Sequence, residues 1–364
     1  MNRFPEIRKN FGFGFMRLPM KEGRVDIATT TEMVDTFLAR GFNYFDTAHG
    51  YIDGQSETAL RQCLTSRYAR DRYVLTNKLS DFYFETEAEI LPLFEAQLAA
   101  CGVEYFDFYL MHAMNAQRHE KYQKTHAYDV AAALKAQGRI RHMGISFHDS
   151  AEVLDRILTD RPEIEVVQLQ FNYVDYEDPE VQSRACYEVC RKHDKPVIVM
   201  EPVKGGSLVN LPPEALALLE GGSPASYAIR FAAGFEGIRM VLSGMSDLAQ
   251  MEDNTGFMAD FRPLSEAEQE TVSRVRAIYQ SRHRIPCTAC RYCTEVCPMG
   301  IPIPELFAGM NAHWETGAVL SPEPLEAASA CVRCGRCAAA CPQHLRIPEL
   351  LARIRENMAE PSVF

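Results

Sequence analysis

No hydrophobic segment of this 364-residue chain is long enough to cross a bilayer, and Met1–Asn10 lacks the apolar core of a secretory signal. The chain also lacks an excess of positive charge, because its formal net charge is −11 and its pI is about 5.5. That balance disfavours nucleic acid and anionic membranes as main partners. We therefore expect a cytoplasmic protein, in a compartment where thiols stay reduced.

The Gly-x-Gly-x-x-Gly fingerprint of dinucleotide-binding sheets is missing as well. Gly12 and Gly14 lie in the first expected strand, but Arg17 stands where the third glycine would be. Residues 1 to about 260 contain instead a regular alternation of short apolar runs with helical stretches. Apolar runs without polar alternation are typical of parallel strands buried on both faces.

Eight strands alternating with helices over this length favour a (β/α)8 barrel, with a doubly wound sheet as the alternative. The expected strands are Phe11–Leu18, Phe42–Asp46, Tyr73–Asn77, Phe106–Met111, His142–Ser146, Val166–Phe171, Val197–Glu201 and Arg239–Ser243. The expected helices are Ile27–Arg40, Glu57–Arg67, Glu87–Ala100, Tyr128–Gln137, Ala151–Leu158, Pro179–Lys192 and Pro224–Ala233.

Two copies of one cysteine spacing, Cys-x2-Cys-x2-Cys-x3-Cys-Pro, lie in the last eighty residues or so. The ligand candidates are Cys287, Cys290, Cys293 and Cys297 in the first copy, and Cys331, Cys334, Cys337 and Cys341 in the second. The spacing resembles that of bacterial two-cluster ferredoxins, in which three thiolates bind one [4Fe–4S] cluster and the fourth binds the other. The resemblance implies two [4Fe–4S] clusters. Structural zinc is disfavoured, because it uses paired Cys-x2-Cys knuckles.

The repeat continues beyond the cysteines. Residues 303–306 and 347–350 both read Ile-Pro-Glu-Leu, which places a proline in the first turn of a helix after each loop. We therefore expect a small, mainly α-helical ferredoxin-like domain at residues 281–364, after a barrel at residues 1–280. The other cysteines show no ligand spacing and are interpreted as packed or surface thiols; they are Cys63, Cys101, Cys186 and Cys190.

The chemistry of a (β/α)8 barrel lies at the carboxyl ends of its strands. Asp46, Lys78 and His112 end three successive expected strands, and Tyr51 lies in the loop after the first. The stretches 45–51 (FDTAHGY), 54–57 (GQSE), 76–78 (TNK) and 107–112 (DFYLMH) resemble the aldo/keto reductase superfamily, and the resemblance spans residues 11 to about 258. The whole chain resembles the subgroup with a fused C-terminal 4Fe–4S tail.

This resemblance implies a role for each of the four residues. Tyr51 would donate a proton to the alkoxide that develops when a hydride reaches a carbonyl carbon. A nearby Lys78 ammonium would lower the pKa of Tyr51, and Asp46 would hold that ammonium in place. His112 would orient the carbonyl oxygen by donating a hydrogen bond.

The resemblance also implies contacts to a nicotinamide cofactor along four later segments. The nicotinamide contacts would be Ser146, Gln168 and Asn172, the pyrophosphate contacts Pro202, Lys204, Gly206 and Leu208, and the adenosine contacts Gly244, Gln250, Asp253 and Asn254. Gln250 stands where NADP-using relatives often carry an arginine, which would clamp the 2′-phosphate. The chain could use NAD or NADP, and Gln250 favours NAD.

The two halves move electrons in different numbers. A [4Fe–4S] cluster passes single electrons, whereas nicotinamide moves two as a hydride; a flavin ordinarily couples the two, but no flavin-binding motif is recognisable. The main interpretation is an NAD(P)H-dependent oxidoreductase that interconverts a small carbonyl compound and an alcohol, with clusters that transfer electrons or sense redox state. The alternative is a ferredoxin-linked electron-transfer protein or reductase whose barrel does not use nicotinamide.

A ferredoxin or another redox protein is an expected partner under both interpretations. The substrate is not specified, because specificity in barrels lies in loops, here expected at Asn115–Thr125.

Overall fold

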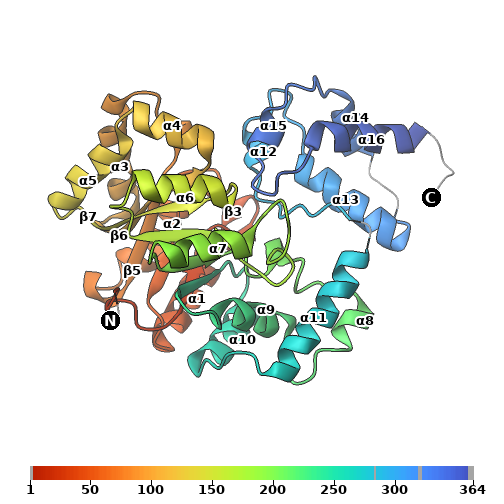
Figure 1. Ribbon diagram of the computed structural model, residues 1–364, viewed down its shortest axis with the longest axis horizontal. Helices are drawn as coiled ribbons and strands as arrows, with labels where there is room; N and C mark the ends of the chain where they lie inside the picture. The colour runs from red at the N-terminus through yellow and green to blue at the C-terminus, as the bar shows by residue number, and fades with distance from the viewer. Residues whose placement is uncertain (1–2, 283, 319–321, 360–364) are drawn as a thin grey trace.

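The computed structural model of the protein describes residues 3–282, 284–318 and 322–359. Eight parallel strands close into a barrel in the order β1-β10-β9-β8-β7-β6-β5-β4, which confirms the barrel and excludes the doubly wound sheet (Figure 1). The strands are β1 Phe11–Gly14, β4 Tyr44–Asp46, β5 Val74–Leu79, β6 Phe106–Met114, β7 Ile140–Phe147, β8 Val166–Gln170, β9 Val197–Met200 and β10 Ile238–Ser243.

The barrel strands are buried on both faces, as their apolar runs predicted. All residues of β4, β5, β6 and β8 are buried. The interior contains Tyr44, Phe108 and Ile198, and it also takes in Phe4 and Ile7 from the N-terminal segment. Asn43, just before β4, binds the backbone of Glu6 and Arg8 through its amide, so this segment closes the amino ends of the strands. The carboxyl ends stay open for a site.

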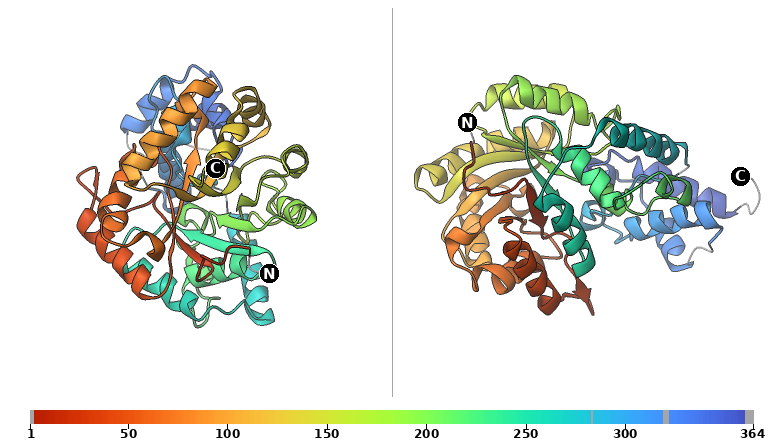
Figure 2. Two further views of the ribbon diagram at one scale, coloured as in Figure 1. Left: turned by 90° about the vertical axis from the view of Figure 1, so that its left-hand side faces the viewer. Right: turned by 90° about the horizontal axis from the view of Figure 1, so that it is seen from below.

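Helices surround the barrel, one after each strand, and a large apolar cluster fills the layer between them (Figure 2). These helices are α1 Ile27–Ala39, α2 Gln55–Leu60, α3 Glu87–Cys101, α5 Ala127–Ala136, α6 Ala151–Asp160, α7 Ser183–Lys192, α9 Pro224–Ala233 and α10 Leu248–Ala259. α2 continues as a π-helical turn over Arg61–Thr65. None of the described helices is both long and apolar enough to span a membrane.

Three local features differ from the expectations. The expected specificity loop Asn115–Thr125 is largely a helix, α4 (Ala116–Lys124), because the Asn115 side chain caps it by accepting from the Arg118 N–H at 2.8 Å. The first strand ends at Gly14 rather than Leu18. α7 begins at Ser183, four residues after the expected Pro179.

Short additional elements lie beside the barrel. β2 (Met20–Lys21) and β3 (Arg24–Val25) form an antiparallel hairpin, and α8 (Pro213–Leu216) packs on α11 (Glu266–Ser281). α11 begins with a capping box and leads the chain from the barrel to the C-terminal tail.

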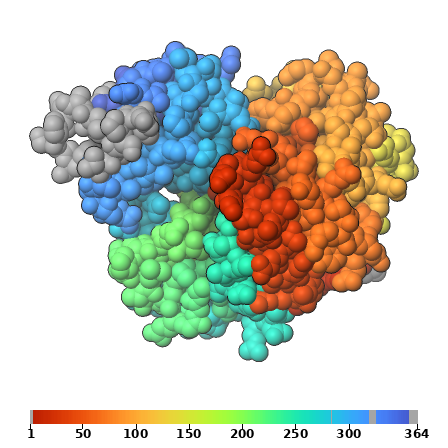
Figure 3. Space-filling view, turned by 180° about the vertical axis from the view of Figure 1, so that it is seen from behind, coloured from red at the N-terminus to blue at the C-terminus, as the bar shows by residue number. Residues whose placement is uncertain are grey.

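Where the structure describes it, the tail from residue 284 onward contains five helices and two cysteine loops. The helices are α12 Tyr292–Glu295, α13 Ile303–Thr316, α14 Pro322–Ser329, α15 Arg336–Ala339 and α16 Ile347–Ala359. α13 carries Pro304 in its first turn, as predicted. The tail has an apolar core of its own, in which Phe307 and Met310 of α13 pack with Leu351 and Ile354 of α16. Figure 3 shows this tail, in blue, lying directly against the barrel.

Candidate active site

A buried ion pair lies beneath the carboxyl ends of β4 and β5. Lys78 Nζ lies 2.7 Å from Asp46 Oδ1 and donates to the Thr47 carbonyl at 2.9 Å. Gln168 donates to the other Asp46 oxygen at 3.4 Å. Burial raises the pKa of Asp46 and lowers the pKa of Lys78, while each partner's charge acts in the opposite direction. The two residues therefore form a compensated pair.

Tyr51 and His112 lie above this pair. Lys78 Nζ is 4.7 Å from the centre of the Tyr51 ring, and the Tyr51 and His112 rings are 5.9 Å apart. His112 Nδ1 lies 2.6 Å from the Ser80 hydroxyl. Burial lowers the pKa of His112 well below its usual value, and the positive charge of Lys78 lowers it further. The imidazole is therefore neutral, and only one of its nitrogens carries a proton.

The pKa of Tyr51 moves in the direction opposite to the prediction. Burial raises it well above the usual value, the negative charge of Asp46 raises it further, and a hydrogen bond with Tyr292 opposes these effects. The prediction had Asp46 hold the Lys78 ammonium in place and took the positive charge of Lys78 as the main effect on the phenol. In the structure Asp46 compensates that charge, so burial determines the direction. Tyr51 is thus a protonated phenol at neutral pH.

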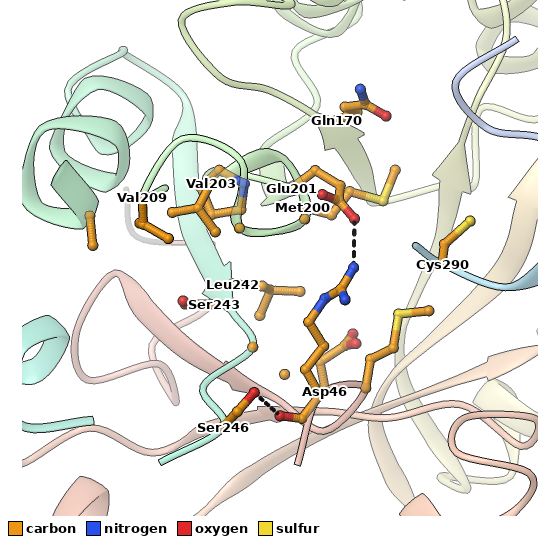
Figure 4. A pocket seen from close by; sticks show the side chains of 18 of the residues that line it. Asp46, Gln170, Met200, Glu201, Val203, Val209, Leu242, Ser243, Ser246 and Cys290 are labelled. Atoms are coloured by element: carbon orange, nitrogen blue, oxygen red, sulfur yellow. Dashed lines mark hydrogen bonds and ion pairs between the residues drawn. The ribbon is translucent and has the colours of Figure 1, made fainter. Parts of the chain in front are cut away.

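One continuous cavity joins these residues to the ends of the later strands. Its lining includes Asp46, Tyr51 and His112 at one end. Eight of the eleven expected cofactor contacts also line it, namely Ser146, Gln168, Pro202, Gly206, Gly244, Gln250, Asp253 and Asn254. Figure 4 shows Asp46, Glu201 and Cys290 around the same cavity as Ser243 and Ser246. The strand ends therefore gather most of the predicted residues around one space.

Three expected cofactor contacts lie outside this lining. Lys204 is buried, forms an ion pair with Asp175 and donates to the Gln343 amide oxygen at 3.3 Å, so its ammonium is engaged by protein groups. Asn172 donates to the same Asp175 carboxylate at 2.6 Å and caps the following turn. Leu208 is completely buried among apolar neighbours. These three side chains pack within or against the loop of residues 201–208 and are not among the residues that line the cavity.

The far end of the cavity carries negative charge. The Gln250 side chain is held by the Ser246 N–H at 2.9 Å and by Asp247 Oδ2 at 2.9 Å. Asp253 accepts from the Ser223 hydroxyl at 2.6 Å. Among the described lining residues Arg17 is the one arginine or lysine, and it faces Glu201 at 3.9 Å, as the dashed line in Figure 4 marks.

The tail contributes residues to this cavity that the sequence did not predict. Tyr292 lies between two ligand candidates, Cys290 and Cys293, and its hydroxyl is 3.2 Å from His112 Nε2. Gln343 exchanges hydrogen bonds with Gln170 at 2.7 and 3.1 Å. Both tail residues, together with Cys290, line the cavity. The tail therefore forms part of the wall of the barrel site.

A second contact fixes the tail on the barrel at the 201–208 loop. The Thr288 carbonyl accepts a hydrogen bond from the Arg17 guanidinium. Gly205 has a φ of +63°, and a Cβ on it would come within 2.6 Å of the Thr288 carbonyl oxygen. Glycine is therefore required here both by its backbone conformation and by the close approach of the tail.

The eight tail cysteines form two sets of thiols in a crossed arrangement. Cys341 joins Cys287, Cys290 and Cys293 around one apolar cavity, which we call the proximal thiol set. Cys297 joins Cys331, Cys334 and Cys337 around another, the distal thiol set. Within the described residues, no three His, Cys, Asp or Glu side chains are grouped to hold a single metal ion.

The donor chemistry of the two sets fits [4Fe–4S] clusters. Each set offers four sulfur ligands, three from one loop and one from the other. Backbone N–H groups point at several sulfurs: that of Ala289 lies 3.4 Å from Cys287 Sγ, and that of Tyr292 binds Cys290. Hydrogen bonds of this kind stabilise thiolate ligands and tune cluster potentials.

Comparisons with known proteins agree with this architecture. Residues 10–277 match the model of the aldo/keto reductase family, and residues 286–345 match that of the 4Fe-4S dicluster domain. The chain belongs to the aldo/keto reductase family. The match to a 4Fe-4S dicluster domain follows that of the aldo/keto reductase family along the chain.

Individual relatives of this chain are distant. An aldo-keto reductase of Mycolicibacterium smegmatis is 30% identical over 144 residues, which is 39% of this chain and 50% of the relative. Norsolorinic acid reductase B of Dothistroma septosporum is 34% identical over 71 residues, 20% of this chain and 18% of the relative. The matched regions thus span about half the length of the curated relatives, or less.

Solved structures share the fold of this chain. An aldo-keto reductase from Klebsiella pneumoniae in complex with NADPH has a TM-score of 0.58 at 20% identity, over 73% of this chain and 90% of that one. The holo form of a Bacillus halodurans aldo-keto reductase has a TM-score of 0.59 at 21% identity, over 74% and 92% of the two chains.

Proposed function

We propose that this reductase interconverts a small carbonyl compound and an alcohol with a nicotinamide cofactor. The observation that carries the proposal is the single cavity that runs from Asp46, Tyr51 and His112 to Gly244 and Asn254. An extended dinucleotide would need such a continuous space across several strand ends. The Klebsiella pneumoniae relative, crystallised with NADPH, supports the cofactor class.

Each residue of the site has a definable task in this reaction. A bound nicotinamide would supply the hydride. Tyr51 donates its phenolic proton to the oxygen of the reduced carbonyl, and its raised pKa keeps that proton in place until the oxygen becomes strongly basic. Neutral His112 donates one hydrogen bond and orients the carbonyl oxygen. After the transfer, the Lys78 ammonium beneath the ring stabilises the negative charge of the Tyr51 phenolate.

The charges at the far end favour NAD over NADP in this proposal. Asp247 and Asp253 lie around Gln250. Arg17, the one lysine or arginine among the described lining residues, directs its guanidinium to Glu201 and the Thr288 carbonyl instead. A 2′-phosphate would add about two negative charges beside these carboxylates. NADH should therefore bind at least as tightly as NADPH.

The cysteines would bind two [4Fe–4S] clusters, one in each thiol set. Such clusters supply single electrons when bound. We place the boundary between the barrel domain and the cluster-binding domain after residue 280, close to the end of α11 at Ser281. We propose a cytoplasmic location, because free thiols and iron–sulfur clusters suit a reducing compartment.

A second candidate function rests on a different observation. Cys290 and Tyr292 line the cavity that also contains Tyr51 and His112, so the proximal thiol set adjoins the reaction site. This contact favours a reductase that receives single electrons from a ferredoxin or similar carrier and uses no nicotinamide. A flavin would be a further way to couple the two electron counts.

Anaerobic titrations separate the two candidates. Protein with full iron and sulfide content is titrated by calorimetry with NADH and NADPH, and cluster absorbance is followed with NADH and with reduced ferredoxin. Binding of NADH, together with NADH-dependent reduction of any member of a panel of aldehydes, ketones and sugars, supports the first candidate. Failure of both nucleotides to bind, with ferredoxin-driven turnover, supports the second.

A further inference from the structure

Charge is distributed unevenly along this chain. Residues 281–364 contain eight arginines and eight glutamates but no lysine or aspartate, so the net charge of −11 belongs entirely to residues 1–280. Within the tail the positive charge is concentrated again: residues 331–355 hold five arginines against one glutamate. The segment that contains the second cysteine loop is therefore basic on an acidic protein.

The distal thiol set is the more accessible of the two. Cys334 is an exposed ligand candidate, whereas Cys290 of the proximal set faces the active-site cavity. Val332 and Met299 line the distal set and are 61% and 46% exposed. Large apolar side chains with this exposure are rare on the described surface of the protein. Their position beside Cys334 marks a small apolar surface over the distal set.

Basic side chains adjoin this apolar surface. Arg333 lines the distal set, and it shares a surface pit with Arg346, His344 and Glu349. Arg333 and Arg346 are exposed, and no ion pair involves either of them within the described ranges. Both guanidinium groups are therefore available to a partner, while Glu349 offsets one positive charge at the edge of the pit.

We propose that Met299, Val332, Arg333 and Arg346 form the docking surface of an acidic one-electron carrier protein of the ferredoxin type. The inference rests on the proposed binding of clusters by the thiol sets, and it adds the face and the charge of the partner. An apolar centre with charged residues at its rim is the usual anatomy of an interface. The acidic barrel repels an acidic carrier, whereas the basic segment attracts it and orients its approach to Cys334.

The test measures binding of an oxidised acidic [2Fe–2S] ferredoxin to the cluster-loaded full chain. Arg333→Glu/Arg346→Glu should weaken the affinity at least tenfold at low ionic strength, measured by calorimetry, and the difference should shrink in 0.5 M NaCl. Lys21→Glu/Arg24→Glu changes the net charge by the same amount at exposed barrel positions without ion pairs in the described structure. This control should stay within about twofold of wild type.

A second variant and a rate measurement complete the test. Val332→Ser should weaken binding in a manner that does not depend on salt, because it removes apolar contact area. The Arg333/Arg346 variant should slow cluster reduction by reduced ferredoxin but not by methyl viologen radical, a small donor that needs no docking surface.

Several outcomes would overturn the inference. Equal affinities for the two charge-reversal variants would show that only net charge matters. Loss of self-association by the Arg333/Arg346 variant in sedimentation velocity, without any change in ferredoxin binding, would assign the face to a second copy of the chain. Iron and sulfide analysis separates these results from failure of the proposed function, in which the clusters themselves would be missing.

Discussion

Replacement of Tyr51 by phenylalanine tests the centre of the proposed mechanism. The change removes one hydroxyl and keeps the ring, so the contacts of that ring with Lys78 at 4.7 Å and with His112 at 5.9 Å remain. Removal of a positioned proton donor typically costs about 10²–10⁴ in rate. At 1.36 kcal/mol per tenfold, this corresponds to about 2.7–5.4 kcal/mol of transition-state stabilisation.

The expected effect on stability is much smaller. The lost hydroxyl group shares a hydrogen bond with Tyr292, and a typical hydrogen bond contributes about 1 kcal/mol. Tyr51→Phe should therefore fold, bind NADH with unchanged affinity and keep its iron. The assay compares anaerobic initial rates of NADH oxidation with whichever carbonyl compound the wild type reduces.

Tyr292→Phe is a matched control in the same cavity. It also loses a phenolic hydroxyl, but that hydroxyl interacts with His112 Nε2 at 3.2 Å and is not proposed to transfer a proton. The change removes the hydrogen bonds of this hydroxyl to His112 and Tyr51, and at about 1 kcal/mol each their loss should reduce the rate by no more than about thirtyfold. The reasoning fails if Tyr51→Phe retains full activity, or if Tyr292→Phe is the more damaging of the two changes.

Three further predictions concern charge, cofactor choice and iron. Asp46→Asn removes a negative charge that raises the pKa of Tyr51, so that pKa should fall, and the loss of reductase activity at alkaline pH should begin at a lower pH than in wild type; an unchanged pH–rate profile would contradict this. Gln250→Arg supplies a guanidinium for the 2′-phosphate, so it should shift the ratio of NADPH to NADH affinity toward NADPH by about tenfold or more, as measured by calorimetry. An unchanged ratio would contradict the placement of the adenosine beside Gln250. Cys297→Ser should lower the iron content from about eight toward four per chain, and the remaining cluster should be that of the proximal thiol set; loss of iron from that set instead would contradict the crossed arrangement.

Features that follow from local sequence were predictable. The apolar runs became buried barrel strands, and Asp46, Lys78 and His112 met at one end because parallel strands in a barrel all point the same way. The cysteine spacing predicted which thiols gather, since the geometry of the loop fixes three ligands and the repeat supplies the fourth. Such arguments need only neighbouring residues or a repeat.

Features that depend on distant contacts were not predictable. The resemblance implied that Lys204 contacts the pyrophosphate, but the fold places the Asp175 carboxylate beside it. No sequence argument singled out Tyr292, which lies 180 residues from His112 along the chain and yet contacts its ring nitrogen. The pKa of Tyr51 was misjudged for the same reason, since the sign depends on how completely Asp46 compensates Lys78.

Tyr292 connects the two halves of the protein structurally. Its neighbours along the chain, Cys290 and Cys293, belong to the proximal thiol set, while its hydroxyl interacts with His112 in the barrel site. Any rearrangement of this loop on loading the thiol set would therefore move a group that contacts the reaction site. Coupling between two binding sites is reciprocal, so if loading the thiol set changes affinity at the barrel cavity, occupation of that cavity would change the stability of the loaded thiol set by the same free energy. A tail joined to the barrel only by a linker would show no such coupling, because its ligand loop would not form part of the cavity wall.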